Sequence, residues 1–153
     1  MTASIWYFAY GSNIDANQMK ERIGRCPDRV LGILRNWRLE FNKASAKVPG
    51  AGFANIMPCP GDAVEGVLYL LSEEELRRLD HYEGVPHHYR RHLVNVERQQ
   101  TGKDVTAVTY VANPEKVQGG LKPTREYLSH LLAGADCLSE GYMQLLRAIE
   151  TLD

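Results

Sequence analysis

The stretch "IWYFAYGSN", residues 5–13, passes abruptly from apolar and aromatic residues to three residues typical of a tight turn. Its first part belongs to a run over 4–10 that predicts a buried β-strand. Gly11 permits positive φ and close backbone approach, so the N–H groups of residues 11–13 can converge on an anion or a carbonyl oxygen. The stretch therefore indicates a strand leading into a ligand-binding loop, although an ordinary strand-to-helix connection would use the same residues.

Further strand patterns follow along the chain. Residues 89–98 and 104–112 carry imperfect alternations of apolar and polar residues and are expected to pair through the Thr101–Gly102 turn. Other runs rich in branched or aromatic residues predict strands over 30–42, broken near Asn36, over 53–57 and over 64–71.

Helix signals are cleaner in the second half. Ser72 with Glu75 three residues later is a capping box, and it predicts a helix over 72–81 that ends before Gly84. A weaker candidate spans 15–23. Thr124 is expected to cap a helix through Leu132, with Tyr127, Leu128, Leu131 and Leu132 on one face, and Ser139 a last helix carrying Tyr142, Leu145, Leu146, Ile149 and Leu152.

The fold class follows from this order of elements. A chain of 153 residues is the size of one domain, so we expect a single domain over 1–153. Several strands with few helices between them do not fit a regular βαβ alternation. We therefore expect an α+β fold in which a small mixed or antiparallel β-barrel is flanked by helices, with residues 43–52 as a surface loop that can reach over a site.

Charge and cysteine content exclude several classes of partner. The 18 basic and 19 acidic residues nearly balance, so nothing points to a nucleic acid or an anionic membrane. The three cysteines are widely separated, which disfavours structural zinc or a redox dithiol and favours the reducing cytoplasm. No secretion signal or membrane-spanning run is recognisable, so we expect a soluble cytoplasmic protein with no membrane partner.

Glu83, in "LDHYEGVPHHYRR" at 79–91, is the main candidate for chemistry. It follows the predicted end of a helix and precedes a glycine and a proline, so we expect it in an ordered turn among apolar and aromatic neighbours. Desolvation there would raise the pKa of its carboxyl toward that of a useful base. The alternative is an exposed turn glutamate paired with Arg90 or Arg91.

Metal and covalent catalysis are both disfavoured. Ser12 does not lie in the Gly-x-Ser-x-Gly elbow of the hydrolases, and nothing assigns it a His/Asp relay. No recognised metal-binding spacing occurs in the cluster His81, Glu83, His87, His88 and His92, so we expect no catalytic metal.

Two motifs taken together are more specific than either alone. "YFAYGSN" at 7–13 followed by "LDHYEGV" at 79–85 closely resembles the gamma-glutamylcyclotransferase family, as do "GAGFANIMPCPGDAVEGVLYLL" at 50–71 and "EGYMQLLRAIE" at 140–150. The resemblance implies a compact barrel flanked by helices. It also implies that a γ-glutamyl amide is cleaved by its own α-amine, which releases 5-oxoproline and an amine or amino acid.

The resemblance also implies roles for residues. The family's catalytic glutamate falls on Glu83. The residues implied to bind the substrate are Tyr10, Gly11, Ser12 and Asn13 of the loop, with Tyr89 and Tyr127 at aromatic positions of the pocket. Because nucleophile and electrophile belong to one molecule, no cofactor is expected.

The partner implied is a small γ-glutamyl substrate, with a homodimer left open. The leaving group is also open: an amino acid, an amine, the ε-amine of lysine, or the partner of a γ-glutamyl protecting group in a biosynthetic pathway. A non-catalytic member of the fold that binds a small ligand or a protein is the alternative from another class.

Overall fold

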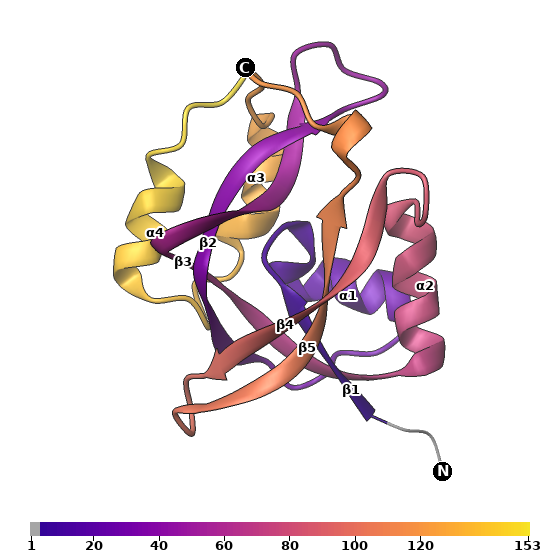
Figure 1. The fold of residues 1–153 in the computed structure, drawn as a ribbon, viewed down its shortest axis with the longest axis vertical. Coiled ribbons are helices and arrows are strands. Elements are labelled where there is room, and N and C mark those ends of the chain that lie inside the picture. The colour runs from indigo at the N-terminus through magenta and orange to yellow at the C-terminus, as the bar shows by residue number, and fades with distance from the viewer. Residues whose placement is uncertain (1–3) are drawn as a thin grey trace.

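A closed barrel of five strands forms the centre of the part of the chain that the structure, a computed structural model, describes, residues 4–153 (Figure 1). The neighbour order is β1-β3-β2-β4-β5. In these residues β1 and β5 pair in parallel to close the barrel, and the other neighbours are antiparallel. The expected mixed β-barrel is therefore confirmed. The strands are β1 (Ser4–Ala9), β2 (Val30–Ala44), β3 (Gly52–Ser72), β4 (Tyr89–Arg98) and β5 (Lys103–Ala112).

Helices flank the barrel, with α2 on one side and α3 and α4 on the other (Figure 1). The N-cap side chain of each α-helix accepts a backbone N–H, and the Ser72–Glu75 capping box is present as predicted. Capping chemistry thus places the helix starts correctly. The α-helices are α1 (Ala16–Ile23), α2 (Glu73–Glu83), α3 (Arg125–Leu132) and α4 (Glu140–Arg147), and the short 3₁₀ turns are η1 (Ser12–Ile14) and η2 (Pro114–Lys116).

Strand β1 contributes to two apolar clusters because its side chains alternate between its faces. Phe8, and Tyr10 directly after the strand, pack in a cluster with strand residues of β2, β3, β4 and β5. Tyr7 and Ala9 pack in a second cluster that includes the buried faces of all four α-helices. This central strand therefore ends, at its loop, where the barrel meets the helices.

The predicted strands 53–57 and 64–71 are wrong as separate elements, because both belong to β3. Residues 59–62 lie opposite Asn36 alone, between the pairs Trp37–Pro58 and Arg35–Ala63. Asn36 adopts a φ of 69°, and its Oδ1 accepts the N–H of Gly61. The extra residues 59–62 form a bulge, and β3 pairs with β2 on both sides of it. This confirms the predicted irregularity near Asn36.

Two further boundaries differ from the prediction. Strand β2 continues through Ala44, so the loop expected over 43–52 is shorter and Lys43 is buried. Helix α4 ends at Arg147, and Leu145 on it is 66% exposed because Tyr142, Met143 and Leu146 form its buried face. The predicted apolar face of the last helix is therefore wrong at Leu145. Ile149 and Leu152 lie beyond the helix; Ile149 still packs against the core, and Leu152 is exposed.

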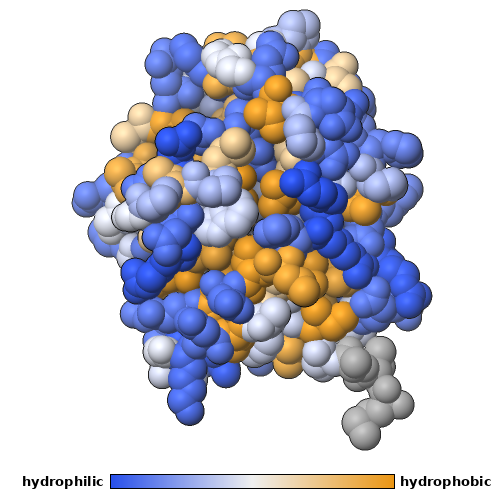
Figure 2. Space-filling model, in the orientation of Figure 1, coloured by the Kyte–Doolittle hydropathy of each residue, from blue (hydrophilic) through white to orange (hydrophobic). Residues whose placement is uncertain are grey.

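The surface of the barrel is partly apolar. Figure 2 shows hydrophobic side chains below the middle of one face, where Figure 1 draws β1, β4 and β5. Leu93 on β4 is one exposed large apolar residue. Apolar surface is common on single chains, so the homodimer left open above stays a prediction. In residues 4–153, none of the helices has the length and apolar character needed to cross a membrane.

Candidate active site

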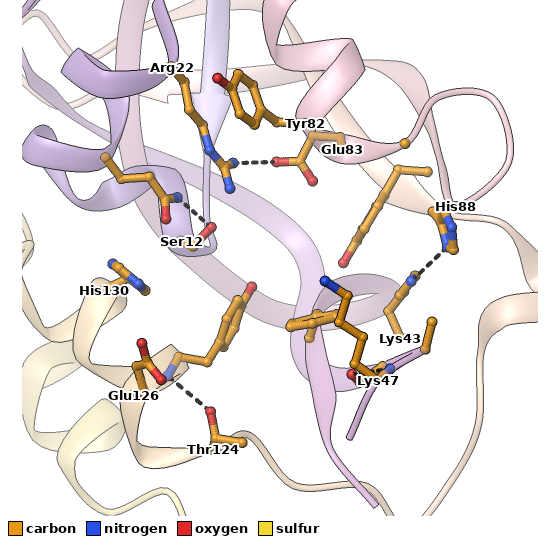
Figure 3. A pocket seen from close by; sticks show the side chains of 17 residues that line it. Ser12, Arg22, Lys43, Lys47, Tyr82, Glu83, His88, Thr124, Glu126 and His130 are labelled. Atoms are coloured by element: carbon orange, nitrogen blue, oxygen red, sulfur yellow. Dashed lines mark hydrogen bonds and ion pairs between the residues drawn. The ribbon is translucent and has the colours of Figure 1, made fainter. Parts of the chain in front are cut away.

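A pocket of about 540 Å³ opens between η1, α1, the end of α2, the β2–β3 loop and α3 (Figure 3). Behind it lies a recess of about 30 Å³, roughly the space of one small polar group. The loop after β1 and the end of α2, some seventy residues apart in sequence, thus meet at one site, as predicted. The residues that line both spaces, and so form the junction between pocket and recess, are Ser12, Glu83, Tyr89 and Tyr127.

Glu83 is the last residue of α2, not a residue beyond the helix as the predicted end at 81 implied. Helix α2 continues to Gly84, whose left-handed conformation (φ 68°) ends it. The Glu83 side chain is only 18% exposed, and Oε1 lies 3.6 Å from the guanidinium of Arg22. Arg90 and Arg91 bond elsewhere, to Ala112 O and to Asp80 and Glu73, so the exposed-turn alternative is wrong.

The environment of Glu83 suits proton transfer. Burial raises the pKa of its carboxyl above the ordinary value, while Arg22, the hydrogen bond from Asn13 and the charge of Lys43 act in the opposite direction. The net rise brings the pKa of Glu83 closer to neutral pH, where a general base must both accept and release protons.

Asn13 holds Glu83 in place. Its Nδ2 donates to Glu83 Oε1 at 3.2 Å and to the Tyr7 hydroxyl at 2.9 Å. Its Oδ1 accepts from Gln18 and from Arg22, each at 3.0 Å. These four bonds use the whole hydrogen-bonding capacity of the amide. The side chain of Asn13 is therefore a positioning group. Its backbone carbonyl accepts the Tyr69 hydroxyl, so the backbone N–H is the group left for the substrate contact predicted from the sequence.

Gly11 brings the loop close to the barrel. Its φ is −113°, so the positive φ that a glycine permits is not used here. Close approach is confirmed, because a Cβ at this position would lie 3.2 Å from both Ala54 Cβ and the Tyr127 hydroxyl. The neighbouring Ser12 accepts a hydrogen bond from Gln18 through its Oγ and lines the pocket.

The three predicted tyrosines differ in what their hydroxyls do. Tyr10 donates to Tyr110 O, and Tyr89 donates to Ala54 O at 2.8 Å. Tyr127 accepts the N–H of Ala54 at 3.1 Å, and its own proton has no acceptor among residues 4–153. Burial raises the pKa of Tyr127, so the hydroxyl keeps that proton. Tyr127 is thus the tyrosine at the pocket junction with a donor to offer.

Two basic residues of the site were missed in the sequence. Arg22 lies on α1, one turn after Gln18, and its guanidinium also stacks on the Tyr82 ring at 4.8 Å. The i, i+4 spacing of Gln18 and Arg22 after the loop was the available signal. Lys43 belongs to the stretch 43–52 that is expected to form a surface loop, and its sequence neighbours give no sign of its burial at the end of β2.

The histidine cluster does not form a metal site. His88 lines the pocket beside Lys43, whereas His92 packs edge-on against Trp37 of β2. Across the described range 4–153, no three metal-ligating side chains come together in a suitable group. A histidine not singled out before, His130, lines the pocket and pairs with Asp15 at 2.8 Å.

Comparison with known proteins gives concordant matches. The AIG2-like family matches residues 63–146. The gamma-glutamylcyclotransferase of Homo sapiens is 30% identical over 98% of this chain and 81% of its own length, and that of Bos taurus is 32% identical with the same coverage. A solved structure of a gamma-glutamyl cyclotransferase superposes with a TM-score of 0.86 at 28% identity, over 99% of this chain and 90% of that one.

Proposed function

The chain belongs to the gamma-glutamylcyclotransferase and AIG2-like family, and from this premise we propose that it cleaves a γ-glutamyl amino acid or amine. The α-amine of the substrate attacks its own γ-carbonyl. A five-membered lactam closes, the γ-amide bond breaks, and 5-oxoproline and the free amine or amino acid leave.

Glu83 carries the proposal. A protonated α-amine has no lone pair for attack, so Glu83 takes one proton from it. The departing nitrogen must gain a proton when the γ C–N bond breaks, and the same carboxyl returns it. The attacking nitrogen loses its second proton as the lactam forms, and the departing amine takes that proton and leaves as an ammonium ion. This use of one group as base and then acid requires a buried carboxyl with a raised pKa at the pocket junction, and Glu83 meets that requirement.

The γ-carbonyl oxygen gains negative charge in the tetrahedral intermediate and needs donors. We assign the hydroxyl of Tyr127 as one donor, because its proton is uncommitted in the described structure and it lies at the junction. The loop at 10–13 provides backbone groups for the glutamyl head. The reaction itself is intramolecular, so the protein's main task is to hold the glutamyl chain in its folded, reactive shape.

The test is product formation. The purified protein is incubated with a panel of γ-glutamyl dipeptides and γ-glutamyl amines, and 5-oxoproline is measured by chromatography. We expect release from at least one member of the panel. A folded protein that releases none would contradict the enzyme and favour the non-catalytic binder.

Arg22→Met should move the acid limb of the kcat/KM profile to higher pH. The Arg22 charge lowers the pKa of Glu83, so its removal raises that pKa further and leaves the base protonated over a wider range. The measurement is the pH dependence of kcat/KM.

Arg77→Met is the matched control for this substitution, because Arg77 lies on the exposed face of α2 and pairs with Glu73, away from the pocket. Its acid limb should coincide with that of the wild type. An unchanged limb in Arg22→Met, or a shift to lower pH, would show that Arg22 does not tune Glu83.

Gly11→Ala should lower kcat about tenfold, because the added methyl presses on the Tyr127 hydroxyl and small misplacements of catalytic groups are costly. The control is Gly141→Ala, where an added Cβ meets open space. Steady-state rates of both variants are compared with the wild type. Equal rates for Gly11→Ala and the wild type would argue against the close-approach role of this glycine.

A further inference from the structure

Lys43 is a buried cation without a carboxylate partner in the described structure. Lys43 is 4% exposed, and within residues 4–153 it takes part in none of the ion pairs. The ammonium lies over the rings of Phe53 and Tyr89, at 5.5 and 5.9 Å from their centroids. Burying an unpaired charge is costly, and ring faces compensate only in part. The arrangement therefore leaves the ammonium able to pair with an anion from outside the chain.

Within residues 4–153 the Lys43 side chain makes one direct polar contact, and this contact leaves it able to bind such an anion. Nζ lies 2.9 Å from Nδ1 of His88. An ammonium has only donors, so Nδ1 accepts and two N–H groups of Lys43 stay free. Burial is the first cause that lowers the pKa of Lys43, and the charge of Lys116 acts in the same direction, whereas the charge of Glu83 raises it. A bound anion would add to the effect of Glu83 and hold the lysine in its charged form.

The position of Lys43 in the site indicates which part of a substrate it meets. It lines the outer pocket but not the recess, whereas Glu83 lines both. Since the attacking amine must reach Glu83, the glutamyl head lies at the junction and the departing group extends into the outer pocket. Tyr89, under the ammonium, belongs to the junction, so Lys43 is next to the point where the scissile bond lies.

The charges around the outer pocket are unevenly distributed. Lys47 lines the same wall as Lys43, and Figure 3 shows both across the pocket from Glu126 and His130. A departing group with a negative charge next to its nitrogen is attracted to this lysine wall, defined as Lys43 and Lys47. A cationic departing group meets repulsion there.

We propose that Lys43 is a specificity-determining residue whose ammonium binds a carboxylate on the departing group, so that the site selects γ-glutamyl amino acids over γ-glutamyl amines. The inference rests on the proposed cyclotransferase reaction for the placement of the substrate. In an α-amino acid the carboxylate is one carbon from the scissile nitrogen, and a simple amine has none. In a lysine linked through its ε-amine the carboxylate is several carbons away, so such a substrate fits less well.

Binding is measured first, in a Glu83→Gln background in which turnover is slowed about a hundredfold or more. Calorimetry compares γ-glutamyl-alanine with γ-glutamyl-ethylamide, the same molecule without the alanine carboxylate. We expect the alanine compound to bind about tenfold more tightly, as for one charge-assisted hydrogen bond. Lys43→Met should abolish the preference by weakening only the alanine compound, Lys43→Arg should retain part of it, and Lys103→Met, on an exposed strand end, should leave it unchanged.

The outcomes separate this inference from the proposed function. Equal affinity for the two compounds without any Lys43 substitution would overturn the inference, and this comparison holds even if Lys43→Met fails to fold. Equal weakening of both compounds by Lys43→Met would overturn it as well, because Lys43 would then bind the glutamyl head or support the fold. If the wild type released 5-oxoproline from neither compound, that result would instead contradict the cyclotransferase activity. The measured affinities would still decide the role of Lys43.

Discussion

Replacing Glu83 with glutamine is expected to lower kcat by about 10²- to 10⁴-fold, the range that general acid–base catalysis contributes. Glutamine keeps the size of the side chain and removes the group that accepts and returns the proton. Its amide can still contact Asn13 after a rotation, so the fold should persist. The measurement is 5-oxoproline release at saturating substrate, with circular dichroism to confirm folding.

The control for this substitution lies on the same helix. Glu74→Gln removes a carboxylate from the exposed side of α2, where it pairs with Arg78, and should leave kcat unchanged. Substrate affinity of Glu83→Gln should stay close to that of the wild type, because the carboxyl acts mainly in the chemical step. Turnover within a few-fold of the wild type would remove Glu83 from the mechanism.

The pH profile offers a second view of the same group. Burial raises the pKa of Glu83, so kcat/KM of the wild type should fall with decreasing pH already above the range of an ordinary glutamate. In Glu83→Gln this limb should vanish from the residual activity.

Local signals in the sequence were sufficient for most of the fold. The capping residues Ser72, Thr124 and Ser139 place helix starts because their side chains satisfy N–H groups whatever the rest of the chain does. Helix ends were less predictable: α2 continues through Glu83 because Gly84, and not the apolar pattern, ends it. The bulge in β3 is a tertiary feature, since it exists only through pairing with β2 around Asn36.

The candidate site was predictable only in outline. The pairing of the loop at 10–13 with Glu83 came from resemblance, and the structure gives the physical link through Asn13. The roles of Arg22 and Lys43 in the site are not predictable from the sequence, because they depend on burial and on partners distant in sequence. A basic residue on a short helix or near a turn is usually solvated, and nothing local distinguishes these two.

The tyrosines show the same limit more sharply. The sequence does not distinguish Tyr10, Tyr89 and Tyr127. A tyrosine near the end of a helix or strand commonly buries its ring and leaves its hydroxyl in contact with solvent. Hydrogen bonding separates them: Tyr10 and Tyr89 donate to backbone carbonyls, and Tyr127 accepts a backbone N–H instead. This difference determines which hydroxyl proton is available to a substrate.

Tyr127→Phe is accordingly expected to lower kcat by about 10²- to 10³-fold, as when one oxyanion donor is removed from other enzymes. The hydroxyl donates to the γ-carbonyl oxygen most strongly when that oxygen carries charge, so the loss should fall on kcat and leave KM nearly unchanged. The ring stays, and with it the contacts to Phe41 and Phe53. Steady-state kinetics with one γ-glutamyl substrate measure both parameters.

Tyr89→Phe provides the matched comparison, because both hydroxyls bond to the backbone of Ala54 from the same pocket. Each substitution leaves one backbone group of Ala54 without its partner, so both should destabilise the fold by about 1–3 kcal/mol, read as a fall in melting temperature. Only Tyr127→Phe should also remove a donor from the reaction, since the Tyr89 proton is already committed to a carbonyl. Similar losses of kcat in the two variants would mean that the Ala54 backbone, and not the Tyr127 proton, controls the rate.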